Sequence, residues 1–208
     1  MYFENRAAAA RKLAEALSEY RGKNPLILAI PRGAVPMARI IADELKGELD
    51  VVLVRKVRAP GNPEFAIGSV DETGWVYLTS HARDVGADEK YIKDEVSMQL
   101  ETIRQRRAQY TPVRPPIDPA GRIVIVIDDG LATGSTMIAA LHALRVKKPV
   151  ELICAVPVAP PDTVEKVRNS ADRVVCLSSP INFYAVAQFY RDFPQITDEE
   201  VIAMLAAA

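Results

Sequence analysis

The residues best suited to chemistry lie together in the stretch 128–136, which is Asp-Asp-Gly-Leu-Ala-Thr-Gly-Ser-Thr. A small-residue turn at the start of a helix binds phosphate, because its N–H groups meet the positive end of the helix dipole. The three hydroxyls of the turn can donate further hydrogen bonds to phosphate oxygens. The two carboxylates would repel a phosphate and would instead accept hydrogen bonds from vicinal hydroxyls, or help to hold a divalent metal through its waters. Sugar hydroxyls beside a phosphate indicate a ribose 5-phosphate.

The segments on either side predict how this stretch is positioned. The wholly apolar run Ile123–Ile127 is typical of a strand buried on both faces of a parallel sheet. Apolar periodicity from Met137 to Val146 predicts a helix. The acids therefore follow a strand and the turn precedes a helix, which is where open α/β sheets bind ligands. Gly130 and Gly134 allow positive φ and close approach of the backbone to a ligand. A Walker A sequence and a Gly-x-Gly-x-x-Gly fingerprint are both absent.

The run Val124–Thr136 closely resembles the 5-phosphoribosyl-1-diphosphate (PRPP) signature of type I phosphoribosyltransferases. The resemblance implies that Asp128 and Asp129 hold the ribose 2- and 3-hydroxyls, serve catalysis, and help to bind Mg²⁺ mostly through water. It also implies that residues 132–136 wrap the 5-phosphate. Gly130 departs from the family pattern, which usually has an apolar residue here. The alternative is an ordinary strand–turn–helix with a chance acidic pair. The predicted PRPP-binding residues are Asp128, Asp129, Gly130, Ala132, Thr133, Gly134, Ser135 and Thr136.

A second strand–turn–helix occurs earlier in the chain. The apolar run Leu26–Ile30 ends at Pro31-Arg32-Gly33-Ala34, and a helix is predicted from Pro36 to Lys46. The guanidinium of Arg32 is a fork of donors that suits a pyrophosphate. In the family this position resembles the pyrophosphate loop, which often carries a strained or cis non-proline bond, so we expect Arg32 and Gly33 to bind pyrophosphate. The alternative is a surface turn with a solvated arginine.

A third buried strand is predicted over Asp50–Val54, followed by Arg55-Lys56-Val57-Arg58. Three cations at the end of a strand repel one another unless they share an anion. The Val-Arg-Lys ending resembles adenine phosphoribosyltransferase and its relatives, in which such residues approach pyrophosphate. Arg55, Lys56 and Arg58 are therefore candidate pyrophosphate ligands. For Lys56 and Arg58, a solvated basic edge is an equally good interpretation.

Residues 59–79 are predicted to form a loop and a β-hairpin. The sequence Ala-Pro-Gly-Asn-Pro predicts a loop at 59–63, and two apolar runs joined by Asp-Glu-Thr-Gly predict a hairpin. Type I enzymes have their mobile catalytic loop in this region, and such a lid excludes water from an activated sugar. Glu64 is a candidate for deprotonating or orienting the incoming nucleophile. The alternative is a plain surface glutamate.

The C-terminal region 180–208 is a candidate hood over an acceptor base. It is rich in aromatic residues between 183 and 193, and Thr197 begins a capping box before a last helix. Core packing is the preferred interpretation for most of these aromatic side chains. Asn182 and Tyr184 are the candidate contacts to the base.

Alternating strands and helices predict the α/β class, with a doubly wound, mostly parallel sheet in a single domain spanning 1–208. Helices are also predicted over 6–20, 88–110 and 161–169, and strands over 150–158 and 173–177. The helix over 6–20 is expected to pack on the sheet without a chemical role. Arg104–Arg107 is interpreted as a solvated helix end, with an RNA-facing patch as the alternative.

Composition narrows the functional classes. The chain has 208 residues, 49% of them hydrophobic, and a formal net charge of −1, so no basic field indicates DNA binding. No apolar run is long enough to cross a membrane, and no signal peptide is recognised at the first residues. Cys154 and Cys176 lie in apolar runs and are interpreted as buried hydrophobic residues. We therefore expect a cytoplasmic location.

The predicted function is transfer of a phosphoribosyl group from PRPP to a purine or pyrimidine base, with release of pyrophosphate. The alternative is a non-catalytic sensor of PRPP or nucleotides on the same fold, binding RNA or a partner protein. The loop over 59–64 and the aromatic tail match none of the acceptor sites of the adenine, hypoxanthine, orotate or uracil enzymes, so the acceptor stays open. The habit of the family indicates a homodimer.

Glu64 provides the first test. If its carboxylate takes a proton from the nucleophile, Glu64→Gln should lower kcat by about 100-fold or more, since general-base catalysis contributes roughly 10²–10⁴. Steady-state pyrophosphate release measures this, with Glu89→Gln as a control that changes charge equally. Unchanged turnover in Glu64→Gln would end the assignment.

Overall fold

The computed structural model describes the backbone of residues 1–208 and every side chain except those of Pro63 and Glu64. Its main sheet has five strands, all parallel, in the order β2-β1-β6-β7-β8. The strands are β1 (Leu26–Ala29), β2 (Glu48–Val51), β6 (Ile123–Ile127), β7 (Glu151–Val158) and β8 (Arg173–Ser178). The predicted doubly wound α/β fold is confirmed.

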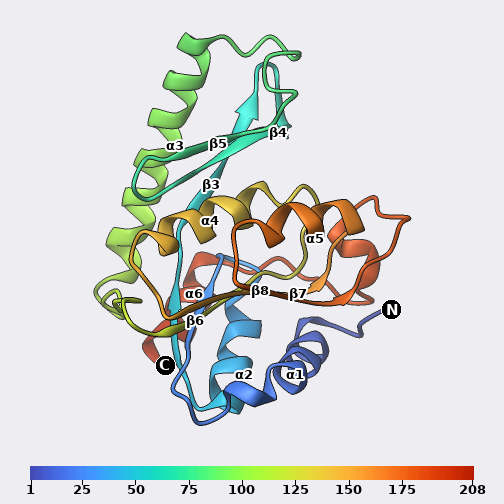
Figure 1. Cartoon of the computed structure of the whole chain (residues 1–208). Helices are drawn as coiled ribbons and strands as arrows, with labels where there is room; N and C mark the ends of the chain where they lie inside the picture. The colour runs from blue at the N-terminus through green and yellow to red at the C-terminus, as the bar shows by residue number, and fades with distance from the viewer.

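Helices cover both faces of this sheet (Figure 1). One face packs against α1 (Arg6–Ala16) and α2 (Val35–Leu45), and the other against α4 (Ser135–Arg145) and α5 (Pro161–Arg168). Successive residues of β6 alternate between the two cores, so that Ile125 and Ile127 belong to the first and Val124 and Val126 to the second. Burial on both faces is the reason that this strand is apolar without interruption.

A second, antiparallel sheet projects from the main body beside the long helix α3 (Figure 1). Its strands are β3 (Val54–Ala59), β4 (Asn62–Asp71) and β5 (Val76–Leu78), and α3 spans Glu89–Tyr110. This confirms the predicted hairpin and adds a third strand to it.

The predicted strand Asp50–Val54 is wrong. β2 ends at Val51, and the amide of Val52 still donates to Ala29 O at 3.0 Å, but the chain then leaves the first sheet and β3 begins at Val54. The apolar run continues through this change because Val52 and Leu53 are also buried. The predicted loop over 59–63 is likewise a tight turn, since β3 ends at Ala59 and β4 begins at Asn62.

The hairpin is attached to α4 at the tip between β4 and β5. The Trp75 and His142 rings stack with centroids 3.7 Å apart and planes inclined by 12°. Asp71 is fully buried beside them: its Oδ1 accepts hydrogen bonds from the amides of Thr73 and Trp75, and its Oδ2 lies 3.5 Å from His142 Nδ1. The hairpin therefore rests on α4, the helix that follows the turn predicted to bind phosphate.

The C-terminal tail packs back on the N-terminus. Phe3 pairs with Tyr190 as an isolated bridge, and the last helix, α6 (Asp198–Ala206), follows. Its capping box is present as predicted, with Thr197 Oγ1 accepting from Glu200 N and Glu200 Oε2 accepting from Thr197 N. Two short 3₁₀ helices are η1 (Ser18–Tyr20) and η2 (Val186–Phe189). Along the described part of the chain, no helix is both long and apolar enough to cross a membrane.

Trp75 is the single tryptophan of the chain, so its fluorescence reports on the attachment of the hairpin. His142→Ala should shift its emission to longer wavelength and lower stability by roughly 0.5–1.5 kcal/mol, the usual contribution of a stacked pair. Emission spectra and chemical denaturation measure both effects. His81→Ala, which changes an exposed histidine, is the control. Equal spectra and stability for the two variants would contradict this role of the stack.

Candidate active site

The candidate site lies where β1 and β6 end side by side. The strands are paired in parallel register, and Ile30 N donates to Ile127 O at 3.0 Å just beyond them. The loops that follow, 31–34 and 128–134, consequently face each other. Between them is a pocket of about 300 Å³. Its lining includes Gly33, Lys56, both acids, and most of the predicted phosphate turn, with Ala132, Thr133, Gly134 and Thr136.

The phosphate turn is held in one shape by neighbouring groups. Thr163 Oγ1 donates to Ala132 O at 2.6 Å, and the Thr133 and Ser135 hydroxyls are 2.8 Å apart. Gly134 has φ of 76°, and a Cβ there would lie 2.9 Å from Thr163 Cγ2. Because α4 begins at Ser135, the first N–H groups of that helix face the pocket end of the turn. This arrangement suits an anion.

Gly130, which departs from the family pattern, has a spatial reason to be glycine. A Cβ at this position would lie 2.7 Å from Cγ1 of Val186 and 3.0 Å from Cγ1 of Val158. Val186 comes from the C-terminal tail and also lines the pocket. The missing side chain therefore leaves room for the tail to close one wall of the site.

Asp129 is held by an arginine that the sequence analysis missed. Arg6, on α1, donates from Nε at 3.0 Å and from Nη2 at 2.8 Å to Asp129 Oδ2. Its Nη1 donates to Pro194 O at 2.6 Å, and its guanidinium lies 3.7 Å from the centre of the Phe193 ring. The expectation that the first helix has no chemical role is therefore incomplete, because Arg6 fixes an acid of the pocket. The partners are 123 positions apart in the sequence, which explains why no local pattern revealed the pair.

Gly33 allows the second loop to approach this ion pair. A Cβ on Gly33 would overlap Asp129 Oδ2 and lie 3.0 Å from Arg6 Nη2. The peptide bond between Pro31 and Arg32 is cis, as the resemblance implied. Any side chain at position 33 would thus displace the carboxylate or the guanidinium.

The two carboxylates share a cramped environment. Burial raises the pKa of Asp128 well above its usual value, and the charge of Asp129 raises it further, while the Asp129 amide, Lys56 and Arg6 oppose the shift. Burial also raises the pKa of Asp129, against the opposing effect of Arg6. Keeping the two buried carboxylates ionised therefore costs free energy. Hydroxyl donors or a cation entering the pocket would reduce that cost.

A second pocket, of about 280 Å³, adjoins the first and is cationic. Its lining includes Arg55, Lys56, Arg58 and Arg106, and it shares Lys56 and Thr136 with the first pocket. The pKa of Arg55 is lowered by burial and by the positive charges of Arg106, Arg58 and Arg32. These cations need an anion to relieve their repulsion. Arg106, on α3, was not among the predicted ligands.

Arg32 has a different orientation from the one expected. Its Nη1 lies 3.5 Å from Asp198 Oδ2 on α6, and it is not among the residues that line either pocket.

The basic residues of the stretch 104–107 lie in different environments. Arg107 bonds both oxygens of Glu72 at 2.7 and 2.8 Å, whereas Arg104 is exposed. A solvated helix end is therefore the wrong interpretation for Arg106 and Arg107, and the four residues do not make one exposed patch.

The predicted base contacts lie outside the pocket lining. Asn182 and Tyr184 are exposed, Tyr184 by 90%. Gln188 bridges their loop, since its Oε1 accepts from Tyr184 N at 2.8 Å and its Nε2 donates to Asn182 O at 3.2 Å. Phe189 and Tyr190 are buried, as the core-packing interpretation predicted. The side chain of Glu64 lies outside the described residues.

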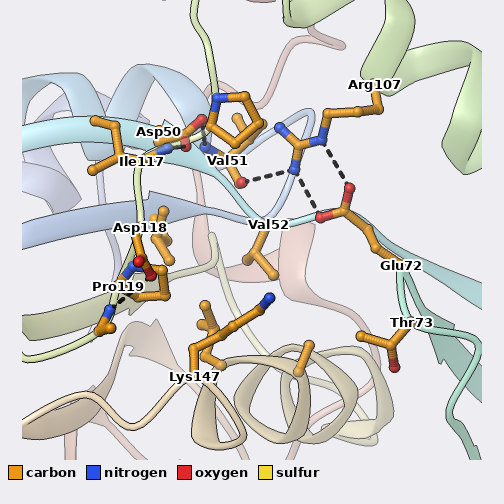
Figure 2. A pocket seen from close by; sticks show the side chains of 15 residues that line it. Asp50, Val51, Val52, Glu72, Thr73, Arg107, Ile117, Asp118, Pro119 and Lys147 are labelled. Carbon is orange, nitrogen blue, oxygen red and sulfur yellow. Dashed lines mark hydrogen bonds and ion pairs between the residues drawn. The ribbon is translucent and has the colours of Figure 1, made fainter.

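A larger cavity, of about 740 Å³, lies between β2, the 116–120 connector and the end of α4 (Figure 2). Its charged groups are largely engaged with one another. Arg107 bonds Glu72 and Val51 O, and Asp50 accepts from the amides of Val51 and Ile117 (Figure 2). It contains neither the acid pair nor the phosphate turn, so it is not the candidate active site.

The protein itself supplies few ligands for a metal. Within the described side chains, no group of three or more His, Cys, Asp or Glu converges as a metal site. Asp128 and Asp129 offer hard oxygen ligands, but one oxygen of Asp129 is occupied by Arg6. This donor set fits Mg²⁺ that takes its remaining ligands from water and substrate oxygens.

Comparison with known proteins identifies the family. The profile of the phosphoribosyl transferase domain matches residues 1–194. Rv0571c of Mycobacterium tuberculosis, whose name assigns it provisionally to the phosphoribosyl transferases, is 38% identical over 207 residues. That match covers 99% of this chain and 47% of Rv0571c, so the chain spans about half the length of this relative.

Solved structures agree with the fold. The protein TT1426 from Thermus thermophilus is 45% identical, with a TM-score of 0.83 over 100% of this chain and 99% of the other. A hypothetical protein from Neisseria gonorrhoeae is 14% identical, with a TM-score of 0.50 over 100% and 98%. The second likeness concerns the fold alone.

The acid pair yields a prediction for stability. Because the folded pKa of Asp128 is raised, its protonated form stabilises the fold fully below the unfolded pKa of about 4, and this contribution is lost as pH rises through the raised value. Asp128→Asn, which cannot ionise, should therefore be more stable at pH 7 by roughly 1–3 kcal/mol, with the gain shrinking toward pH 4. Denaturation at several pH values measures it.

The control for this measurement is Asp162→Asn, which removes an exposed carboxylate. It should show no such pH-dependent gain. A loss of stability in Asp128→Asn at pH 7 would contradict the inference that the buried, ionised Asp128 carboxylate destabilises the fold.

Proposed function

Because this chain belongs to the phosphoribosyl transferase family, we propose that it transfers the 5-phosphoribosyl group of PRPP to a nitrogenous base and releases pyrophosphate. One observation carries the proposal. The turn 132–136 and a pair of carboxylates line one pocket, and a cationic pocket adjoins it at the same edge of the sheet. A ribose that bears a phosphate and a diphosphate needs these three environments close together.

Each part of PRPP has a counterpart in the two pockets. The turn 132–136 and the start of α4 suit the 5-phosphate. Asp128 and Asp129 accept hydrogen bonds from the ribose hydroxyls. The cationic pocket takes the diphosphate, and Lys56 and Thr136, which line both pockets, bridge its two ends. Pyrophosphate contacts from Arg32 and Gly33 are part of the same proposal.

The reaction is a displacement at C1 of the ribose. A nitrogen of the base forms the new bond to C1 as the bond from C1 to the diphosphate oxygen breaks, and the configuration at C1 inverts. Positive charge builds on the sugar beside the carboxylates of Asp128 and Asp129. Negative charge builds on the leaving pyrophosphate beside Arg55, Lys56 and Arg58. Catalysis then consists chiefly of positioning and electrostatic stabilisation.

Mg²⁺ is the proposed cofactor, held by Asp128 and Asp129 mostly through water. When bound, it supplies positive charge to the oxygens of the diphosphate and the ribose. Arg6 leaves the acid pair only partly neutralised, which retains the attraction for such a cation. The remaining ligands come from the substrate.

The acceptor side is proposed to lie under the tail 180–208, which acts as the hood. Val186 of this tail lines the first pocket, and Asn182 and Tyr184 lie outside its lining on the loop just before Val186. Tyr184 offers an exposed ring for stacking on a planar purine or pyrimidine, and Asn182 an amide for its edge. Gln188 restrains this loop, which lowers the entropy that binding a base would cost. Residues 59–79 act as the lid, with Glu64 as the group that receives or orients the proton.

The remaining proposals rest on what is usual in this family. They are a cytoplasmic homodimer with PRPP and a small-molecule acceptor as its partners, and one phosphoribosyltransferase domain over residues 1–208. The whole activity is proposed for this chain alone, although the mycobacterial relative is about twice as long.

Calorimetric titration of PRPP with Mg²⁺ tests the proposal. The double variant Asp128→Asn plus Asp129→Asn should lose about 100-fold or more in PRPP affinity, because each charge-assisted hydrogen bond contributes about 1.5–3 kcal/mol. A double control, Asp94→Asn plus Asp162→Asn, removes two exposed carboxylates and should bind like the unaltered protein. Unaltered PRPP affinity in the first pair would contradict the proposed site.

A panel of purine and pyrimidine bases follows, with pyrophosphate release as the readout. Release with one base establishes an enzyme and names its acceptor. PRPP binding without release for every base would instead favour the non-catalytic sensor.

A further inference from the structure

The cationic pocket carries an internal carboxylate at its border, Asp198 of α6. We propose that Asp198 is a resident counter-anion, which holds Arg32 and Arg106 until a diphosphate group arrives and then releases them to it. The inference rests on the proposed function and concerns how tightly that site holds pyrophosphate. In this view Arg106 is a further ligand of the leaving group, and Asp198 is a positioning residue that limits product affinity.

The geometry gathers three groups from separate elements around one carboxylate. Arg32 Nη1, from the loop after β1, lies 3.5 Å from Asp198 Oδ2. Arg106 Nε, on α3, lies 4.0 Å from Asp198 Oδ1. Tyr110, one turn further along α3, donates its hydroxyl to the same Oδ1 at 3.0 Å. Arg106 lines the cationic pocket, so this carboxylate lies next to the place where an anion would bind.

The contacts of Asp198 with the two arginines are weak enough to exchange. Charge-assisted hydrogen bonds between guanidinium and carboxylate are about 2.7–2.9 Å long, and both distances here are greater. The side chains of Arg32, Arg106 and Asp198 are 34%, 20% and 33% exposed, and ion pairs so accessible to water contribute little to stability. A diphosphate offers more charge and several oxygens in a geometry that a guanidinium can bond bidentately.

The neighbouring carboxylates carry too little charge for the cluster. Burial lowers the pKa of Arg55; the charges of Arg106, Arg58 and Arg32 lower it further, and Glu95 of α3 opposes the shift. The three arginines therefore repel Arg55 even with Asp198 and Glu95 in place. Asp198 therefore relieves part of the repulsion between the arginines and leaves the pocket with a net positive charge. This positive charge attracts a polyanion. The polyanion must, however, compete with the Asp198 carboxylate for Arg32 and Arg106.

Tyr110 keeps the carboxylate in position after the exchange. It is fully buried, and burial together with the charge of Asp198 raises its pKa to about 12, so its hydroxyl remains a donor over the physiological range. Asp198 is also the first residue of α6, where the helix dipole favours a negative charge. The acid can thus lose both arginines without being left unpartnered.

The exchange gives a reason for placing a carboxylate beside a leaving-group site. Without Asp198, the four arginines would retain pyrophosphate more strongly, and release of product limits turnover in many enzymes. A competing acid lowers that affinity. It also ties occupancy of the pocket to α6, which packs against α2 and α3.

Calorimetric titration of sodium pyrophosphate at low ionic strength tests the inference. Asp198→Asn keeps an acceptor for Tyr110 but removes the charge, and it should bind pyrophosphate about fivefold more tightly than the unaltered protein. Glu15→Gln, on α1, makes the same change in net charge at an exposed position and should alter affinity less than twofold. Arg106→Gln, which leaves α6 intact, should weaken binding about tenfold. In the Arg106→Gln background, the effect of Asp198→Asn should shrink.

The outcomes separate this inference from the proposed function. Equal or weaker pyrophosphate binding by Asp198→Asn, with PRPP binding retained, would overturn the counter-anion role alone. An equal gain in Glu15→Gln would also overturn it, because the effect would then be one of net charge. If Asp198→Asn does not fold, unchanged pyrophosphate affinity in Arg106→Gln overturns it independently. Failure of the unaltered protein to bind either PRPP or pyrophosphate would refute both proposals.

Discussion

The ion pair between Arg6 and Asp129 is the interaction on which the rest of the site depends. One guanidinium bonds the carboxylate twice, donates to Pro194 O, and lies on the Phe193 ring, so it joins the first helix, the end of β6 and the C-terminal tail. Breaking a buried pair by removing one partner typically costs about 3–5 kcal/mol, since the other charge is left uncompensated. The pair also sets the residue at position 33, where only glycine leaves room for it.

The charges around this pair are separated in a way that folding alone would not favour. Two acids lie adjacent at the end of a buried strand, and burial raises the pKa of both. Next to them, arginines from β3 and α3 crowd one another, and burial together with their repulsion lowers the pKa of Arg55. A fold selected for stability alone would interleave these charges. Opposite charges held apart across adjoining pockets suit a ligand with hydroxyls at its centre and phosphates at its ends.

The sequence predicts those features whose causes are local. Uninterrupted apolar runs located the strands of the main sheet to within about two residues, because burial on both faces leaves no polar position. The same rule failed at Asp50–Val54, where the apolar run continues while the chain passes from one sheet to the other. Arg6 and Asp198 could not be predicted as site residues, because their partners are 123 and 166 residues away. Gly130 was noticed as a departure, but its cause, Val186, is equally remote in sequence.

Helix α4 connects the turn proposed to bind the 5-phosphate with the hairpin proposed to act as the lid. Its first residues belong to the turn proposed to bind phosphate, and its last turn carries His142, against which the hairpin rests through Trp75. Asp71, buried at the same contact, fixes the turn of the hairpin by accepting hydrogen bonds from two of its amides. A ligand phosphate that settles at the start of α4 therefore acts on the element that supports the hairpin. Contact with α4 restrains the tip between β4 and β5, so closure of the proposed lid would have to involve its opposite end, where β3 turns into β4.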